Sequence, residues 1–371
     1  MIEAGGIVQV SDISVGHGNF DSVSLIRSLC ELYGLPGVIL EPDQPEKPLA
    51  DLGAGLSSIR IPVSGPFRSQ EGRVEFVYKT AEWIDRLKPR ILVIRCSWNI
   101  PVLYRLKRKA PLVLYHATES TTYYGDSDAE FNRHAADWID AVIFPEENRA
   151  KLDIRRCGFE KIPVAIAYNS PLRLADLKQP VEASARNGKI MYSGALDVRA
   201  TFVEYYANPR MQAFPVDIYG YVGGSEPDRT QQILQSAGGR ITYRGFVSSA
   251  ELERARPNYS YGLTIWNPDK ENQRYACPCK FFESIAAGVP VITAPHPQPG
   301  MLVSRYRCGL VMEDWSLDGM LGALKQAMRI YGTAEYASMV ANCHRAMKVE
   351  LNWDRQFERV KAVLPSRLPG G

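Results

Sequence analysis

The chain has 371 residues, of which 45% are hydrophobic and 23% charged, which is typical of a globular protein long enough for two domains. Its formal net charge of +3 is too small to indicate a nucleic-acid-binding protein. The seven cysteines are an odd number without a regular spacing, which argues against a disulfide framework.

The first half of the chain alternates short apolar segments with amphipathic ones. Ile7–Val10 predicts a buried strand, a loop with Gly16 and Gly18 follows it, and apolar residues then recur at helical spacing. Further strands are predicted at residues 37–40, 91–94, 112–115 and 141–144, with helical stretches such as 77–87 between them. This alternation indicates a parallel, doubly wound sheet.

A second series of strands follows an aperiodic stretch at residues 170–188 that is typical of a linker between domains. These strands are predicted at residues 189–194, 216–220, 241–245, 261–265 and 289–293. Glycines near their ends suit a nucleotide that approaches the backbone, although a single glycine is also common in turns. Residues 335–364 are amphipathic and helical.

Residues 278–293 predict a short helix, a stop and a buried strand. Pro278 suits the first helical position, and Gly288 suits the helix end. Lys280 in the first turn would reinforce an anion site at the helix N-terminus, and Glu283 lies one turn further on the same face. A carboxylate there can accept hydrogen bonds from two vicinal hydroxyls while the lysine meets a diphosphate, but the spacing also fits a solvated ion pair.

The segment Lys-Phe-Phe-Glu-x-x-Ala-Ala-Gly-x-Pro-Val-Ile at residues 280–292 resembles the donor-nucleotide segment of GT-B glycosyltransferases, in particular the retaining GT4-like group. The resemblance implies an α/β fold of two Rossmann-like domains whose parallel sheets face each other across a cleft. Residues 1–172 would bind the acceptor, residues 173–345 would bind the nucleotide sugar, and a C-terminal helix in 346–371 would cross back to the first domain. It also implies that Glu283 holds the ribose and that Lys280 faces the diphosphate.

Other donor-site residues follow from the same resemblance. Residues 192–199 resemble a segment in which a basic residue after a glycine faces the phosphates; here these are Gly194 and Arg199, whose guanidinium could bridge two phosphate oxygens. Phe246 or Val247 would pack against the nucleobase. Cys279 is a small thiol in the donor loop, beside Lys280.

In the first half, Gly16 and Gly18 lie where the family has a loop near the donor phosphates and the acceptor. His116 lies just after a predicted strand, where many related transferases have a histidine near the donor sugar. It could donate to a sugar hydroxyl, or it could be structural. We therefore take His116, Arg199 and Lys280 as the candidate catalytic residues.

Two positions depart from the family. Many members carry a second glutamate eight positions before the ribose-binding one, and this chain has Tyr275 there, so recognition of the donor sugar must differ. Asp126-Ser127-Asp128 has the Asp-x-Asp form of metal-using glycosyltransferases, but its place before a helix favours capping of that helix. We expect no metal and no other cofactor.

The resemblance implies a retaining, metal-independent hexosyltransferase acting on a nucleotide sugar, which we expect to be UDP-linked. The acceptor would be a saccharide or a lipid-linked saccharide, as in surface polysaccharide or glycoconjugate synthesis. A GT-B binding protein without turnover is an alternative that Tyr275 favours. An NAD-dependent oxidoreductase is another, since Gly16 and Gly18 follow a strand and Glu41 comes about twenty residues later, but Asp21 replaces the third glycine of that fingerprint.

The N-terminus lacks a basic region followed by an apolar core, and no run of eighteen apolar residues occurs, so we expect a cytoplasmic protein. Arg105, Lys107, Arg108 and Lys109 form a local basic cluster. A solvated helix end and peripheral contact with anionic lipid headgroups are both open interpretations of it.

Overall fold

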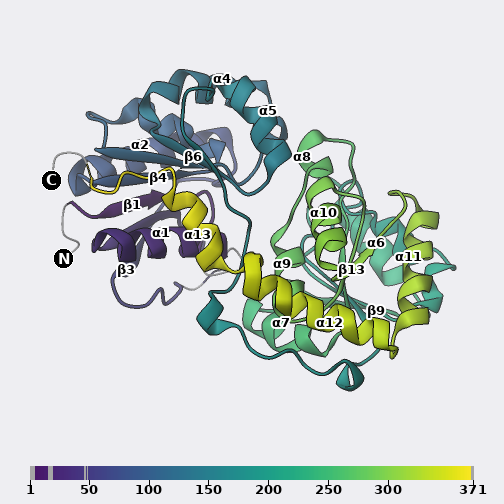
Figure 1. Ribbon diagram of the computed structural model, residues 1–371. Coiled ribbons are helices and arrows are strands. Elements are labelled where there is room, and N and C mark those ends of the chain that lie inside the picture. The colour runs from purple at the N-terminus through teal and green to yellow at the C-terminus, as the bar shows by residue number, and fades with distance from the viewer. Residues whose placement is uncertain (1–4, 16–19, 46, 48, 369–371) are drawn as a thin grey trace. The chain divides into compact units, whose positions relative to one another are not determined.

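The computed structural model describes residues 5–15, 20–45, 47 and 49–368, and it divides into two compact units (Figure 1). The N-terminal unit comprises Met1–Tyr168 and Gln356–Gly371, and the C-terminal unit comprises Asn169–Arg355. Each unit has a separate hydrophobic core built around its own sheet. Gly16 and Gly18 lie outside the described residues.

The N-terminal unit is built on a seven-stranded parallel sheet in the order β3-β2-β1-β4-β5-β6-β7. Its strands are β1 (Ile7–Val10), β2 (Gly37–Pro42), β3 (Leu56–Ile61), β4 (Ile91–Arg95), β5 (Leu112–His116), β6 (Ala141–Phe144) and β7 (Val164–Ile166). Its helices are α1 (Phe20–Tyr33), α2 (Gln70–Leu87), η1 (Ser97–Arg105), α3 (Thr121–Tyr124), α4 (Asp126–Ala135), η2 (Ala136–Trp138) and α5 (Glu147–Cys157). The strand order reverses between β1 and β4.

The C-terminal unit is built on a six-stranded parallel sheet in the order β10-β9-β8-β11-β12-β13. Its strands are β8 (Ile190–Ser193), β9 (Val216–Tyr219), β10 (Ile241–Gly245), β11 (Tyr261–Thr264), β12 (Val291–Thr293) and β13 (Gly309–Val311). Its α-helices are α6 (Pro227–Ser236), α7 (Ser249–Ala255), α8 (Glu271–Arg274), α9 (Cys279–Ala286), α10 (Pro297–Tyr306), α11 (Leu317–Ile330) and α12 (Ala334–Ala346). The strand order reverses between β8 and β11.

Short 3-10 turns complete the C-terminal unit: η3 (Leu174–Asp176), η4 (Ala183–Ala185), η5 (Val203–Ala207), η6 (Met211–Ala213) and η7 (Arg256–Asn258). The π-helical turn η8 (Met347–Leu351) precedes the last helix, α13 (Trp353–Lys361). From Gln356 onward α13 belongs to the N-terminal unit, where the Gln356 side chain accepts from the backbone N–H of Tyr168 at 3.0 Å. The sequence placed the domain boundaries after residues 172 and 345.

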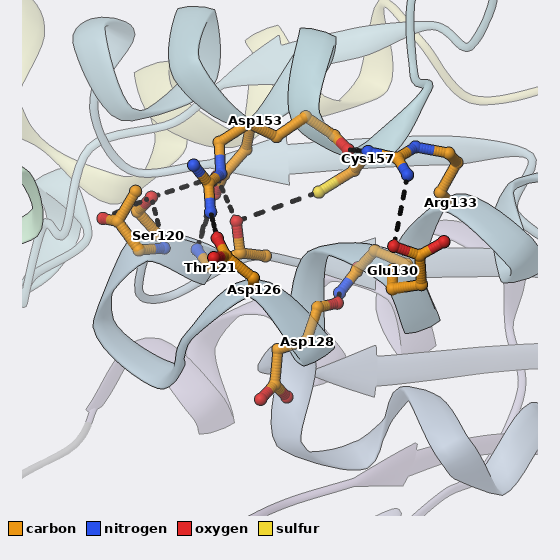
Figure 2. A network of polar contacts seen from close by, with 11 residues as sticks. Ser120, Thr121, Asp126, Asp128, Glu130, Arg133, Asp153 and Cys157 are labelled. Carbon is orange, nitrogen blue, oxygen red and sulfur yellow. Dashed lines mark hydrogen bonds and ion pairs between the residues drawn. The ribbon is translucent and has the colours of Figure 1, made fainter.

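The Asp-x-Asp segment does not cap its helix, and that prediction is wrong. Gly125 is the N-cap of α4, and Asp126 is the first helical residue. The Asp126 carboxylate pairs with Arg156 at 2.8 Å, whereas the buried Asp128 carboxylate accepts from Arg73 at 3.1 Å. Figure 2 shows Asp126 beside the Ser120–Thr121 turn and Asp128 pointing away from it. The two carboxylates therefore have separate partners, and neither fills the N-cap position.

Candidate functional site

Three side chains of the C-terminal unit meet where the strand order reverses between β8 and β11. In open α/β sheets, ligands bind beyond the carboxyl ends of the strands at such a point. Tyr192 comes from β8, Trp266 follows β11, and Lys280 lies in the first turn of α9. The Lys280 Nζ lies 3.8 Å from the centre of the Tyr192 ring and 5.2 Å from that of Trp266. The ammonium is therefore held against two aromatic faces, which attract a cation.

The sequence of α9 explains why Lys280 is fixed there. Phe281, Phe282 and Ile285 are fully buried, so the apolar face of the helix fastens it to the unit. Pro278 is the N-cap, with an extended backbone (φ −74°, ψ 156°), so its predicted place at the first helical position is wrong by one residue. Gly288, at φ 69°, follows the last turn, as the sequence predicted.

Lys280 is a buried charged residue of this unit. It is 7% exposed, and within the described part of the chain the amine has no hydrogen-bond partner. Burial lowers the pKa of the amine to about 7, while the nearby Glu283 carboxylate raises that pKa and the Arg256 guanidinium lowers it. Burying an amine without a hydrogen-bond partner costs free energy. An anionic ligand that accepted a hydrogen bond from the amine would offset this cost.

Two glycines let the backbone pass close to the amine. Gly194 directly follows β8 with φ 139°, and a Cβ atom there would lie 3.0 Å from the Lys280 Nζ. Gly220 directly follows β9 with φ 153°, and a Cβ atom there would lie 1.7 Å from the Gly194 carbonyl oxygen. A side chain at either position would collide with this arrangement, so the close approach of the backbone requires glycine.

Glu283 lies on α9 one turn after Lys280, and it has a partner that the sequence did not predict. The Arg256 Nη2 donates to Glu283 Oε2 at 2.5 Å, and its Nη1 donates to Ser193 Oγ at 3.3 Å. The Glu283 side chain is 25% exposed and that of Arg256 only 7%. No local motif marks Arg256, because its partners lie 27 and 63 residues away in the sequence.

His296 is a second residue that the sequence analysis missed. Its buried ring accepts the Trp266 backbone N–H on Nε2 at 3.2 Å, so Nδ1 must carry the proton that it shares with the Arg274 carbonyl at 3.0 Å. This neutral imidazole fixes the loop that carries Trp266 and the turn that leads to Tyr275. Tyr275 itself is partly exposed.

The remaining donor-site candidates lie at the same edge of the sheet but are less enclosed. The Arg199 side chain is 71% exposed, and its Nε donates to Glu226 Oε1 at 2.7 Å. Phe246, after β10, is 74% exposed, and its ring centre lies 6.4 Å from that of Tyr221. The other two candidates, Val247 and Cys279, are partly buried.

In the N-terminal unit, His116 is the last residue of β5 and is 4% exposed. The carboxyl edge of this sheet also carries a buried ion pair between Asp12 and Arg95, at the reversal point between β1 and β4. Glu41, the acid that the oxidoreductase alternative requires, is buried; it accepts the Val15 backbone N–H at 2.6 Å and lies 3.5 Å from the Arg60 Nε. The Glu41 carboxylate therefore already interacts with other groups of the protein.

No group of three or more His, Cys, Asp or Glu side chains in the described ranges is placed to hold a metal ion. Among the helices that the structure describes, none combines the length and the apolar character needed to span a membrane.

A scan against protein-family models finds no match to the chain, and neither does a search of curated proteins. Solved structures are similar along nearly the whole length. Sucrose-phosphate synthase from Thermosynechococcus elongatus has a TM-score of 0.74 at 15% identity, covering 97% of this chain and 98% of that one. Anabaena Alr3699/HepE in complex with UDP and glucose has a TM-score of 0.74 at 12% identity, with 97% and 99% covered. The chain has the GT-B fold.

A third GT-B structure, the lipopolysaccharide outer core galactosyltransferase WaaB, has a TM-score of 0.64 at 12% identity and covers 96% of this chain and 99% of its own. The GT-B fold, with its two parallel Rossmann-like sheets of seven and six strands, confirms the predicted fold class. At these identities the likeness shows the fold, and the activity has to be argued from the site.

Proposed function

We propose that the chain is a glycosyltransferase that takes a hexose from a nucleotide sugar, most simply a UDP-sugar. The observation that carries this proposal is the buried amine of Lys280, which has no hydrogen-bond partner among the described residues and lies beside Gly194 at the reversal point of the C-terminal sheet. The fold supports it, because Anabaena Alr3699/HepE was solved in complexes with UDP, with UDP and glucose, and with UDP-glucose.

Each donor-site residue then has a role that matches its surroundings. Lys280 neutralises the charge of the diphosphate, and Glu283 accepts hydrogen bonds from the ribose hydroxyls. Gly194 has no side chain, so the diphosphate can lie close to the backbone. Phe246, with Val247 beside it, offers an exposed ring to the nucleobase. Arg199 would add a second positive charge after its guanidinium releases Glu226. Cys279 contributes its backbone at the start of α9.

The proposed reaction retains the anomeric configuration and needs no metal. The bond between the anomeric carbon and the donor phosphate oxygen breaks, the acceptor hydroxyl oxygen attacks the same face, and its proton passes to the departing phosphate oxygen. Lys280 stabilises the negative charge that develops on the diphosphate. His116, from the N-terminal unit, would contact the donor sugar. No separate general base is required.

The proposed acceptor is a saccharide or a lipid-linked saccharide, as in surface polysaccharide or glycoconjugate synthesis in the cytoplasm. Arg105, Lys107, Arg108 and Lys109 are all exposed, which supports peripheral contact with an anionic membrane surface. Two of these cations also have contacts within the protein: Lys109 pairs with Asp140 at 2.8 Å, and the Arg105 guanidinium lies 4.2 Å from the centre of the Tyr78 ring.

Nucleotide binding tests the proposal directly. UDP should raise the melting temperature of the purified chain, because a ligand that binds only the folded state stabilises that state. The measurement is a thermal-shift series with UDP, GDP, ADP and NAD, in which Glu283→Gln should reduce the UDP effect. A shift with NAD and none with a nucleoside diphosphate would favour the oxidoreductase and contradict the proposal.

A GT-B binding protein without turnover is the second candidate, and Tyr275 in place of the family carboxylate favours it. Incubation with radiolabelled UDP-glucose separates the two candidates. Slow release of UDP indicates an enzyme, whereas binding without release indicates a binding protein.

UDP affinity should fall as the pH rises above about 7. The pKa of the free Lys280 amine is about 7, and a bound diphosphate would raise it, so binding takes up a proton between those two pKa values. Affinity should be nearly constant just below pH 7 and should fall by up to roughly tenfold per pH unit above it. Glu283 and Arg256 are the charged groups that face the amine.

Calorimetric titration with UDP in two buffers of different ionisation enthalpy measures this proton directly. Near pH 8.5 we expect an uptake that approaches one proton per UDP, and none in Lys280→Met. Equal heats in both buffers for the unmodified chain would show that Lys280 does not change its charge on binding.

A further inference from the structure

Arg256 joins two elements of the donor site through one buried guanidinium. Its two terminal nitrogens donate to Ser193 Oγ at the end of β8 and to Glu283 Oε2 on α9. Hydrogen bonds between a cation and a carboxylate are strong, and exclusion of water strengthens them further. The planar fork fixes the direction of both bonds. The Glu283 carboxylate is therefore held by a rigid partner.

The turn that carries Arg256 is itself anchored to the sheet. Tyr259 follows η7, and its hydroxyl donates to the buried Asp217 carboxylate of β9 at 2.7 Å. Burial raises the pKa of the Tyr259 phenol, so the hydroxyl keeps its proton and remains a donor. The Tyr259 backbone N–H also donates to the Arg256 carbonyl at 3.0 Å. Arg256 thus starts from a fixed backbone position.

Glu283 has two competing cations nearby. The Lys280 amine is close enough for the carboxylate to raise its pKa, yet the carboxylate hydrogen-bonds Arg256 and not Lys280. Pairing of Glu283 with Lys280 would neutralise the ammonium that the diphosphate needs. By binding Glu283 Oε2, Arg256 keeps the Glu283 carboxylate apart from the Lys280 ammonium. The remaining lone pairs of the carboxylate are then available to a ligand.

We propose that Arg256 is a positioning residue that directs the Glu283 carboxylate toward the ribose hydroxyls and so makes the site selective for ribonucleotides. This inference rests on the proposed function, in which Glu283 binds the ribose. A carboxylate held in one orientation accepts from both vicinal hydroxyls, and a 2′-deoxyribose supplies only one of them. A carboxylate that swings toward Lys280 would not distinguish the two sugars.

The test is calorimetric titration of the full chain with UDP and with 2′-deoxy-UDP, and the readout is the ratio of the two dissociation constants. The unmodified chain should prefer UDP by roughly tenfold, the value of one charge-assisted hydrogen bond. In Arg256→Met this ratio should fall below about threefold, with Arg256→Lys between them, because a lysine keeps the charge and loses the fork. Arg210→Met, which removes an exposed arginine that pairs with Asp318, should leave the ratio unchanged.

Glu283→Gln and the double variant Arg256→Met/Glu283→Gln should show the same low ratio, since Arg256 acts through Glu283. If Arg256→Met does not fold, Ser193→Ala loosens the other end of the bridge and should lower the ratio partway. Equal weakening of both nucleotides, with the ratio preserved, would mean that Arg256 is only structural and would overturn the inference. A chain that binds UDP but never distinguishes it from 2′-deoxy-UDP also overturns it, whereas failure to bind UDP at all overturns the proposed function.

Discussion

Lys280→Met should slow sugar transfer by one to two orders of magnitude while making the ligand-free protein more stable. In the proposed donor site the lost ammonium would meet the diphosphate. A hydrogen bond to a charged group contributes about 1.5–3 kcal/mol, so kcat/KM should fall by roughly 10- to 150-fold. In the absence of ligand the same amine is buried, and the part of the chain that the structure describes offers it no hydrogen-bond partner. A methionine of similar length fills the space and removes the cost of burying a polar group, about 1–3 kcal/mol in proteins.

Thermal melts with and without UDP, together with donor kinetics, measure both effects on the same samples. We expect Lys280→Met to melt several degrees higher than the unmodified chain and to show almost no further rise with UDP. Lys189→Met is a matched control, because Lys189 belongs to the same unit and pairs with Asp217 at 3.3 Å. An unchanged UDP response in Lys280→Met would remove Lys280 from the donor site.

Much of the fold follows from local patterns in the sequence. Each strand that the sequence predicted is present, because buried parallel strands are short apolar runs bounded by loops. The strands that it missed are at or beside the sheet edges. β3 (Leu56–Ile61) is buried only at its two ends and contains two serines and an arginine, and β7 (Val164–Ile166) and β13 (Gly309–Val311) have only three residues each. Such strands are specified by pairing with a neighbour more than by their own composition.

The donor site was predictable only where its residues lie close together in the sequence. Lys280 and Glu283 share one helix, and their spacing alone places them on one face. Arg256 and His296 act through partners from other elements, which one sequence does not reveal. The two aromatic rings against the Lys280 amine come from β8 and from the loop after β11, and only the reversal of strand order brings them together. Whether the assigned roles hold stays a prediction.

Gly220→Ala should disrupt the donor site more than any other single methyl group. Gly220 lies at the end of β9, and a Cβ atom there would lie 1.7 Å from the Gly194 carbonyl oxygen. Atoms cannot remain at that distance, so either β9 or the Gly194 turn must move. Because the β8 and β9 ends are hydrogen-bonded, with the Gly194 N–H donating to the Tyr219 carbonyl at 3.0 Å, the movement would pull the backbone away from Lys280. We expect destabilisation of about 3 kcal/mol or more together with loss of UDP binding.

Gly332→Ala separates this clash from the ordinary cost of a positive φ angle. Gly332 belongs to the same unit, has φ 78°, and a Cβ atom there meets nothing within 4 Å. Its replacement should therefore cost only the strain of a left-handed alanine, about 1–2 kcal/mol, and UDP should still bind. Denaturant unfolding and UDP titration of both variants give the comparison. If Gly220→Ala lost no more stability than Gly332→Ala and bound UDP normally, the close contact between the β8 and β9 ends would not be what keeps the phosphate position open.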